Sequence, residues 1–187
     1  MAHAKPNPMP QPIVVPMPVG RPASLGVKAF NTGQDWMAAA LEEVQHASRV
    51  DVATFLFDDE LFTQKLLCRL RSRSPFACQI VVDKSAYDQR TSRFQRPRLL
   101  ELQSHGASVL VSQGFDGRSL FGLAGRRGIM HIKAVIIDSR VAYTGTANIT
   151  KSSRVNRELV HRIVGPPVSD ILEAVLSAAA CGQGPIL

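Results

Sequence analysis

The chain has 187 residues, which is enough for one domain, or for one domain and a tail. Its residues are 45% hydrophobic and 20% charged, so a packed core can form and disorder along the whole chain is excluded. The 22 lysines and arginines exceed the 15 aspartates and glutamates, and the net charge of +7 favours an anionic partner: nucleic acid, an anionic lipid surface or a phosphate-bearing small molecule.

The first 25 residues differ in composition from the rest of the chain. Seven of the first 22 residues are prolines, which fix φ and remove hydrogen-bond donors. We therefore expect residues 1–25 to be a flexible, proline-rich tail and residues 26–187 to be a single domain. We see no signal peptide and no apolar run of about 20 residues that could span a membrane. The three cysteines lack metal-ligand spacing, and together these features favour a cytoplasmic location.

Strands and helices alternate along the remaining sequence. The assignment rests on apolar residues at helical spacing, on short apolar-rich runs and on glycine-rich breaks. The predicted strands are residues 25–30, 50–57, 77–83, 107–111, 129–138, 141–144 and 158–164. The predicted helices are residues 34–47, a helix opened by Asp58 and Asp59, 93–104 and 168–180. This alternation predicts an α/β fold in which a mixed β-sheet lies between layers of helices.

Basic residues are concentrated in one segment, residues 84–133. Nine basic residues stand there against three acidic ones, so this segment alone carries +6. The basic residues are Lys84, Arg90, Arg93, Arg96, Arg98, Arg118, Arg126, Arg127 and Lys133. The segment is either a solvated arginine-rich helix face followed by a loop, or a track that binds an anion.

The clearest chemistry begins at the end of this segment and continues beyond it. His131 and Lys133 are two apart on a predicted strand, so both side chains should leave the same face of the sheet. On the return strand, Gly145 would let the backbone approach a ligand closely, while Thr146 and Asn148 offer a hydroxyl and an amide. An imidazole, an ammonium, a hydroxyl and an amide that converge on one spot suit a tetrahedral phosphoryl group.

These residues resemble the HKD motif of the phospholipase D superfamily at every defined position: His131-x-Lys133-x4-Asp138-x6-Gly145-Thr146-x-Asn148. Thr146 stands where the family commonly has Ser, and it keeps the hydroxyl. Downstream, Asn156-x-Glu158 is similar to the acidic element that accompanies the motif. The resemblance implies the phospholipase D-like fold and phosphodiesterase activity without a metal ion or other cofactor. The catalytic motif that it implies consists of His131, Lys133, Asp138 and Glu158.

The chain carries one such motif, whereas the long enzymes of the family carry two. No other histidine has a lysine two residues further on; the others are His3, His46, His105 and His161. The chain is therefore similar to the small single-motif members, which build one active site from two identical subunits. A homodimer is implied, because a two-fold axis places His131 and its mate opposite each other.

The resemblance also implies a role for each residue of the site. His131 of one subunit attacks phosphorus and His131 of the other protonates the leaving group. Glu158 is the candidate for orienting a histidine through its second ring nitrogen. Asp138 is expected to be a turn and structural acid rather than a proton carrier. The residues expected to bind the phosphoryl oxygens are Lys133, Thr146 and Asn148.

Three functions remain open. The favoured one is a metal-independent endonuclease in which Arg118, Arg126 and Arg127 bind the nucleic-acid backbone beside the motif; single-motif members of the family include such enzymes. The second is hydrolysis of an anionic phospholipid such as cardiolipin, although the similar mitochondrial cardiolipin hydrolases have a membrane anchor where this chain has its proline-rich tail. The third is a non-catalytic nucleic-acid-binding module, which would not need the His-Lys-Asp spacing.

Overall fold

The computed structural model describes residues 25–88, 93–114 and 128–182. The predicted tail lies outside these ranges except for Leu25. The elements follow in the order β1 (Gly26–Thr32), α1 (Gly33–His46), β2 (Arg49–Thr54), α2 (Glu60–Leu70), β3 (Ala77–Asp83), α3 (Lys84–Asp88), α4 (Gln95–Ser104), β4 (Ser108–Ser112), β5 (Ala134–Ile137), β6 (Val141–Gly145), the 3₁₀ helix η2 (Ser152–Arg154), β7 (Arg157–Val164) and α6 (Pro167–Ala180).

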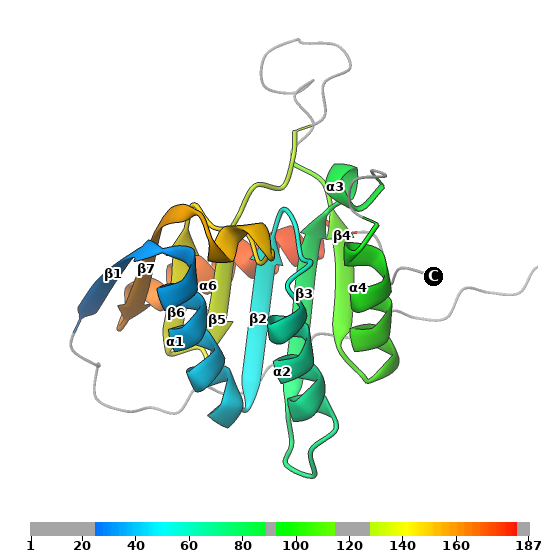
Figure 1. Ribbon diagram of the computed structural model, residues 1–187, viewed down its shortest axis with the longest axis horizontal. Helices are drawn as coiled ribbons and strands as arrows, with labels where there is room; N and C mark the ends of the chain where they lie inside the picture. The colour runs from blue at the N-terminus through cyan, green and yellow to red at the C-terminus, as the bar shows by residue number, and fades with distance from the viewer. Residues whose placement is uncertain (1–24, 89–92, 115–127, 183–187) are drawn as a thin grey trace, which may run out of the picture.

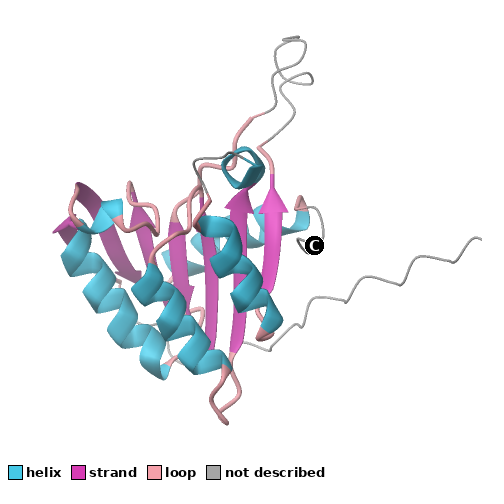
Figure 2. Ribbon diagram, turned by 45° about the vertical axis from the view of Figure 1, so that its right-hand side comes forward, coloured by secondary structure: helices cyan, strands magenta, loops and turns pink. Residues whose placement is uncertain are grey.

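The strands form one mixed sheet in the order β1-β7-β6-β5-β2-β3-β4 (Figure 1). β2, β3 and β4 are parallel, because helices α2 and α4 carry the chain back between them. β5, β6, β7 and β1 pair antiparallel with their neighbours. Helices α1, α2 and α4 cover one face of the sheet and α6 lies on the other, as Figures 1 and 2 show. The predicted α/β fold with a mixed sheet between helices is confirmed.

Each face of the sheet has its own hydrophobic core. Beneath α1 and α2, the fully buried side chains include Trp36, Phe62 and Leu66. Strand β5 has all four residues buried, and its side chains divide between the two faces. Val135 and Ile137 belong to the core beneath α1 and α2, whereas Ala134 and Ile136 pack toward α6. An uninterrupted apolar strand of this kind is buried on both sides. It therefore fixes the positions of the residues directly before and after it in the chain.

Side-chain caps define the starts of two helices. The hydroxyl of Thr32 accepts the N–H of Asp35 at the start of α1, with a distance of 3.2 Å. The carboxylate of Asp59 accepts the N–H of Phe62 at 2.8 Å, so the predicted helix after the two aspartates is confirmed. The short helix α3 was not predicted, and it begins directly after Asp83, the last residue of β3.

The predicted strand at residues 129–138 is wrong in its first half. Only residues 134–137 pair as strand β5, and residues 128–133 have no regular secondary structure. The predicted strand at residues 50–57 also ends early, at Thr54. The hairpin between β5 and β6 is confirmed, with its turn at Asp138 and Ser139, whose φ angles are +50° and +54°.

Candidate active site

Most of the predicted site residues that the structure describes gather along one edge of the sheet. In the antiparallel register, Ala134 of β5 lies between Ala53 of β2 and Thr144 of β6. Gly145, the last residue of β6, is opposite Val160 of β7. The segments just beyond these pairs therefore meet where β2 and β6 end and where β5 and β7 begin. These segments contain Phe55, His131, Lys133, Thr146 and Glu158.

Hydrogen bonds from two strands and from Lys133 within the segment hold the residues around His131, in place of strand pairing. The carboxylate of Asp83 accepts the N–H of Met130, with 2.6 Å between Oδ2 and N. The ammonium of Lys133 donates to the carbonyl oxygen of His131 at 3.3 Å. The hydroxyl of Thr144 donates to the carbonyl oxygen of Lys133 at 2.9 Å. These three contacts explain why this segment departs from the strand that its residues predicted.

The imidazole of His131 is exposed at this edge and lies against an aromatic ring. Its ring centroid is 5.7 Å from that of Phe55, in an edge-on arrangement with an interplanar angle of 70°. Ile132 packs against the core beneath α6. Lys133 instead lines a small cavity together with Trp36, which belongs to the core on the other face of the sheet. Ile132 and Lys133 therefore contact different cores although this segment is not a strand.

Lys133 is partly withdrawn from solvent. Burial lowers its pKa below the usual value of 10.5, because removing water disfavours the ammonium form. The negative charge of Glu158 opposes this and raises the pKa of Lys133. A cation held in such a site attracts a phosphate oxygen more strongly than a fully solvated lysine would.

Glu158 is hydrogen-bonded to two neighbouring side chains. The hydroxyl of Thr146 donates to Oε2 of Glu158 at 2.6 Å, and the amide of Asn156 donates to Oε1 at 3.5 Å. The Thr146 hydroxyl also accepts the N–H of Leu159 at 3.0 Å. Glu158 therefore fixes the orientation of the Thr146 hydroxyl. The role of Glu158 in orienting a histidine ring stays a prediction.

Gly145 is required for a different reason from the one predicted. A Cβ atom at this position would lie 2.0 Å from the carbonyl oxygen of Leu159 and 2.8 Å from Cα of Val160. The glycine lets β7 approach β6 closely, and the approach that it permits is that of the neighbouring strand. This close packing brings Thr146 and Glu158 together across the two strands.

Asn148 is fixed by the end of strand β2. Its side-chain oxygen accepts the hydroxyl of Thr54 and the N–H of Leu56, each at 3.3 Å. No hydrogen bond to another described residue occupies its Nδ2 group, so the amide can still donate to a ligand.

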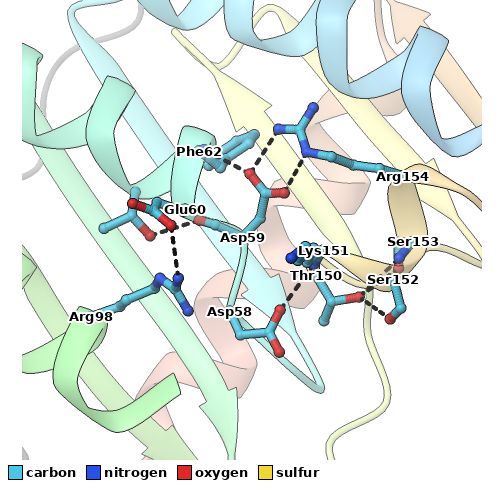
Figure 3. A network of polar contacts seen from close by, with 11 residues as sticks. Asp58, Asp59, Glu60, Phe62, Arg98, Thr150, Lys151, Ser152, Ser153 and Arg154 are labelled. Carbon is cyan, nitrogen blue, oxygen red and sulfur yellow. Dashed lines mark hydrogen bonds and ion pairs between the residues drawn. The ribbon is translucent and has the colours of Figure 1, made fainter. Parts of the chain in front are cut away.

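The chain after Asn148 is tied to the loop that follows β2 by the contacts drawn in Figure 3. Arg154 forms two hydrogen bonds with the carboxylate of Asp59, at 2.5 and 2.7 Å. Asp59 is almost fully buried, with 1% of its surface exposed. Asp58 accepts the N–H of Lys151 at 3.0 Å. The capping pattern predicted that Asp58 and Asp59 open a helix, but it gave no sign of these contacts about 95 residues away.

The comparisons with known proteins agree with this geometry. The family described as "Cardiolipin synthase, PLD-like domain" matches residues 39–179, about three quarters of the chain. The chain belongs to the phospholipase D superfamily. It is thereby placed among the phosphodiesterase domains of that superfamily. No curated protein sequence matches the chain.

Several solved structures share this phospholipase D fold. NucT from Helicobacter pylori superposes with a TM-score of 0.71 at 19% identity, over 87% of this chain and 100% of its own. Nuc from Salmonella typhimurium, a phospholipase D family member, gives 0.70 at 17% identity, over 88% and 100%. Phosphatidylserine synthase from Haemophilus influenzae gives 0.60 at 15% identity, over 89% of this chain but 41% of its own.

Within the phospholipase D motif, Asp138 stands apart from the other residues. It follows β5 at the opposite edge of the sheet, and five nearly extended residues of about 3.3 Å each place it roughly 16 Å from Lys133. Its Oδ1 accepts the N–H groups of Ser48 and Arg49, both at 2.8 Å. Asp138 therefore locks the hairpin turn to the start of β2, as expected for a structural acid, and its place in the catalytic set stays a prediction.

The three arginines predicted to bind a nucleic-acid backbone lie outside the described residues. They are Arg118, Arg126 and Arg127. Among the residues that the structure describes, no group of three or more His, Cys, Asp or Glu side chains could hold a metal ion. In the same ranges, none of the helices has the length and apolar character needed to cross a membrane.

Proposed function

We propose that this chain is a metal-independent endonuclease that hydrolyses nucleic-acid phosphodiester bonds through a phosphohistidine, in an active site shared by two identical subunits. The observation that carries this proposal is the gathering of His131, Lys133, Thr146 and Asn148 at one edge of the sheet, with the imidazole exposed. His131 supplies a nucleophile, and Lys133 and Asn148 supply donors for a phosphoryl group, whereas the hydroxyl of Thr146 already donates to Glu158.

The proposed reaction has two steps. A neutral ring nitrogen of His131 attacks phosphorus, so a P–N bond forms while the P–O bond to the leaving group breaks. The leaving oxygen takes a proton from His131 of the partner subunit. That histidine, now neutral, removes a proton from water; the resulting hydroxide attacks phosphorus, and the P–N bond breaks. Lys133 and Asn148 bind the phosphoryl oxygens and stabilise the charge of each transition state.

The surface around the site supports pairing with a second copy of the chain. Three large apolar side chains next to site residues are exposed: Ile129 by 52%, Val155 by 87% and Leu159 by 51%. Apolar residues around a polar catalytic group are typical of a surface that another protein covers. A two-fold axis through this edge would cover the apolar residues and bring the two His131 rings together.

The charge of the chain supports nucleic acid as the substrate. The net charge of +7 includes +6 from residues 84–133, the segment that ends just after His131. Such a distribution attracts a polyanion along its length, beyond the single phosphate under attack. An anionic phospholipid is the second candidate, since the matching family is described as cardiolipin synthase and phosphatidylserine synthase shares the fold.

The decisive experiment compares the two substrates in the presence of EDTA. Purified protein is incubated with DNA and RNA oligonucleotides and, in parallel, with cardiolipin vesicles. We expect cleavage of an oligonucleotide that persists in EDTA and falls at least about 10³-fold in His131→Ala. His105→Ala is the matched control, because His105 is also exposed but lies at the end of α4, and it should retain full activity.

Three outcomes would overturn the proposal. A requirement for Mg²⁺ would contradict the metal-independent mechanism. Cleavage of cardiolipin alone would establish the lipid as substrate. Tight binding of oligonucleotides without cleavage of either substrate would establish a non-catalytic binding module.

A further inference from the structure

A buried carboxylate outside the HKD motif holds the segment that carries His131. Asp83 is the last residue of β3, and only 1% of its surface is exposed. Its Oδ1 accepts the N–H groups of Ser85 and Ala86, at 2.8 and 3.1 Å, and the hydroxyl of Ser85 at 2.5 Å. This oxygen therefore organises the first turn of α3.

The second oxygen of the same carboxylate reaches a distant part of the chain. Oδ2 of Asp83 accepts the N–H of Met130, which is 47 residues away in sequence and is 4% exposed. Met130 directly precedes His131, and its side chain packs into the core beneath α6 together with Val81 and Ala134. No role in the proposed reaction uses this carboxylate.

We propose that Asp83 is a positioning residue that sets the place of the His131 imidazole by fixing the backbone of Met130; this inference rests on the function proposed above. The described residues before His131, 128–130, are not part of a strand, so the hydrogen bond from the N–H of Met130 to Asp83 holds this backbone in place of sheet pairing. On the other side of His131, the packing of Ile132 and the bond from Thr144 to the carbonyl of Lys133 hold the chain. His131 thus lies between two fixed points.

The chemistry of the site requires a carboxylate rather than an amide. The described groups that bond to Asp83 are all donors: N–H groups and a hydroxyl on Oδ1, and an N–H on Oδ2. An asparagine side chain has one accepting oxygen and one donating NH₂ group. In Asp83→Asn, either the turn of α3 or the N–H of Met130 would therefore face a donor and lose its bond.

The central test measures Asp83→Asn in the full-length protein. We expect kcat to fall about 10- to 100-fold with KM unchanged, because a displacement of the nucleophile by about 1 Å weakens catalysis but not substrate binding. The ring signals of His131 in NMR spectra should shift, while those of His105 stay in place. An unchanged kcat together with unchanged His131 signals would overturn the proposal.

Two matched variants separate positioning from stability. Asp51→Asn removes a carboxylate that is also fully buried, on β2, where it pairs with Arg49 at 2.7 Å; it should lower the melting temperature and leave kcat per folded molecule unchanged. Ser85→Ala weakens only the α3 side of the Asp83 contacts and should leave kcat unchanged. A loss of kcat in either variant equal to that in Asp83→Asn would contradict a specific effect on His131.

One measurement needs no variant and no substrate. Amide hydrogen exchange of the wild-type protein should be slow at Met130, because its N–H is buried and bonded. Fast exchange at Met130 would overturn the proposal even if Asp83→Asn does not fold. If the wild-type protein cleaves neither nucleic acid nor lipid, the proposed function fails, while the NMR and exchange results still test the positioning of His131.

Discussion

The two ends of strand β5 carry the two parts of the HKD motif, and they are built differently. At the first end, His131 is exposed and Lys133 is only partly buried, so their side chains remain available to a ligand. At the far end, Asp138 uses its carboxylate to bind the N–H groups that begin β2. The comparison teaches that one short motif can leave side chains available at one edge of a sheet and use a side chain for stability at the other.

The largest expected effect on activity is that of Lys133→Met, at the first end of β5. Loss of the ammonium should reduce kcat/KM about 10²- to 10³-fold, because a positive charge is removed from the transition state. The free energy of unfolding should not decrease, since burial already disfavours the charged form of Lys133. Steady-state kinetics and chemical denaturation measure the two effects. Lys65→Met is the control, at a partly buried lysine of α2 that donates to Gln45, far from the motif in sequence. A loss of kcat/KM below tenfold in Lys133→Met would contradict the assignment.

The exposed apolar surface near His131 should form the contact between two subunits. Val155→Asp places a charge on the most exposed of the three apolar residues, and it should weaken dimerisation about 100-fold if this surface is the interface. Analytical ultracentrifugation measures the dissociation constant, and turnover should fall in parallel as monomers form. Leu176→Asp, on α6 and 41% exposed, should leave the dimer intact. Full activity of the Val155→Asp monomer would contradict the shared site.

The far end of β5 should respond in stability rather than in catalysis. Asp138→Ala removes the acceptor of two backbone N–H groups and should lower the free energy of unfolding by about 2 kcal/mol. Both bonds use Oδ1, so Asp138→Asn keeps the accepting oxygen and should cost less than about 1 kcal/mol. Urea denaturation measures both changes. A reduced kcat per folded molecule in either variant would place Asp138 in catalysis after all.

The smallest effect should be a shift in the pH dependence of activity when Glu158, next to Lys133, is replaced. Glu158 raises the pKa of Lys133, so Glu158→Gln should lower that pKa further. Because the ammonium form is the one that binds phosphate, activity is lost as pH rises through the pKa of Lys133, and this alkaline limb should move to lower pH. A pH–rate profile measures the shift. An alkaline limb at unchanged or higher pH would contradict a role for charged Lys133.

The sequence predicted much of the fold because local patterns decide it. The apolar run at residues 134–137 is buried, and the turn after it forms as expected. The HKD spacing was sufficient to identify the phospholipase D superfamily, since six positions at fixed offsets agree. The helix after Asp58 and Asp59 followed from capping preferences, which act within one turn.

Predictions from the sequence differed from the structure where a contact joins distant parts of the chain. The sequence predicted a strand through His131, because the residues there suit one, but the N–H of Met130 is bonded to Asp83 instead. From the sequence, Gly145 was expected to let the backbone approach a ligand. In the structure, the carbonyl oxygen of Leu159 occupies the space that a Cβ atom at this position would need. A signal for Asp83 was present, namely an acidic residue at the end of an apolar strand, but its partner could not be read from spacing.

The sequence by itself determined which chemical groups this protein has and roughly where its strands and helices run. It fixed the order His131, Lys133, Asp138 because covalent spacing along the chain is a local property. The predicted strand already separated the first two residues from Asp138; only the tertiary structure decided that Asp138 binds the start of β2. It also decided that Thr146 is held by Glu158, because hydrogen bonds between strands depend on register and packing.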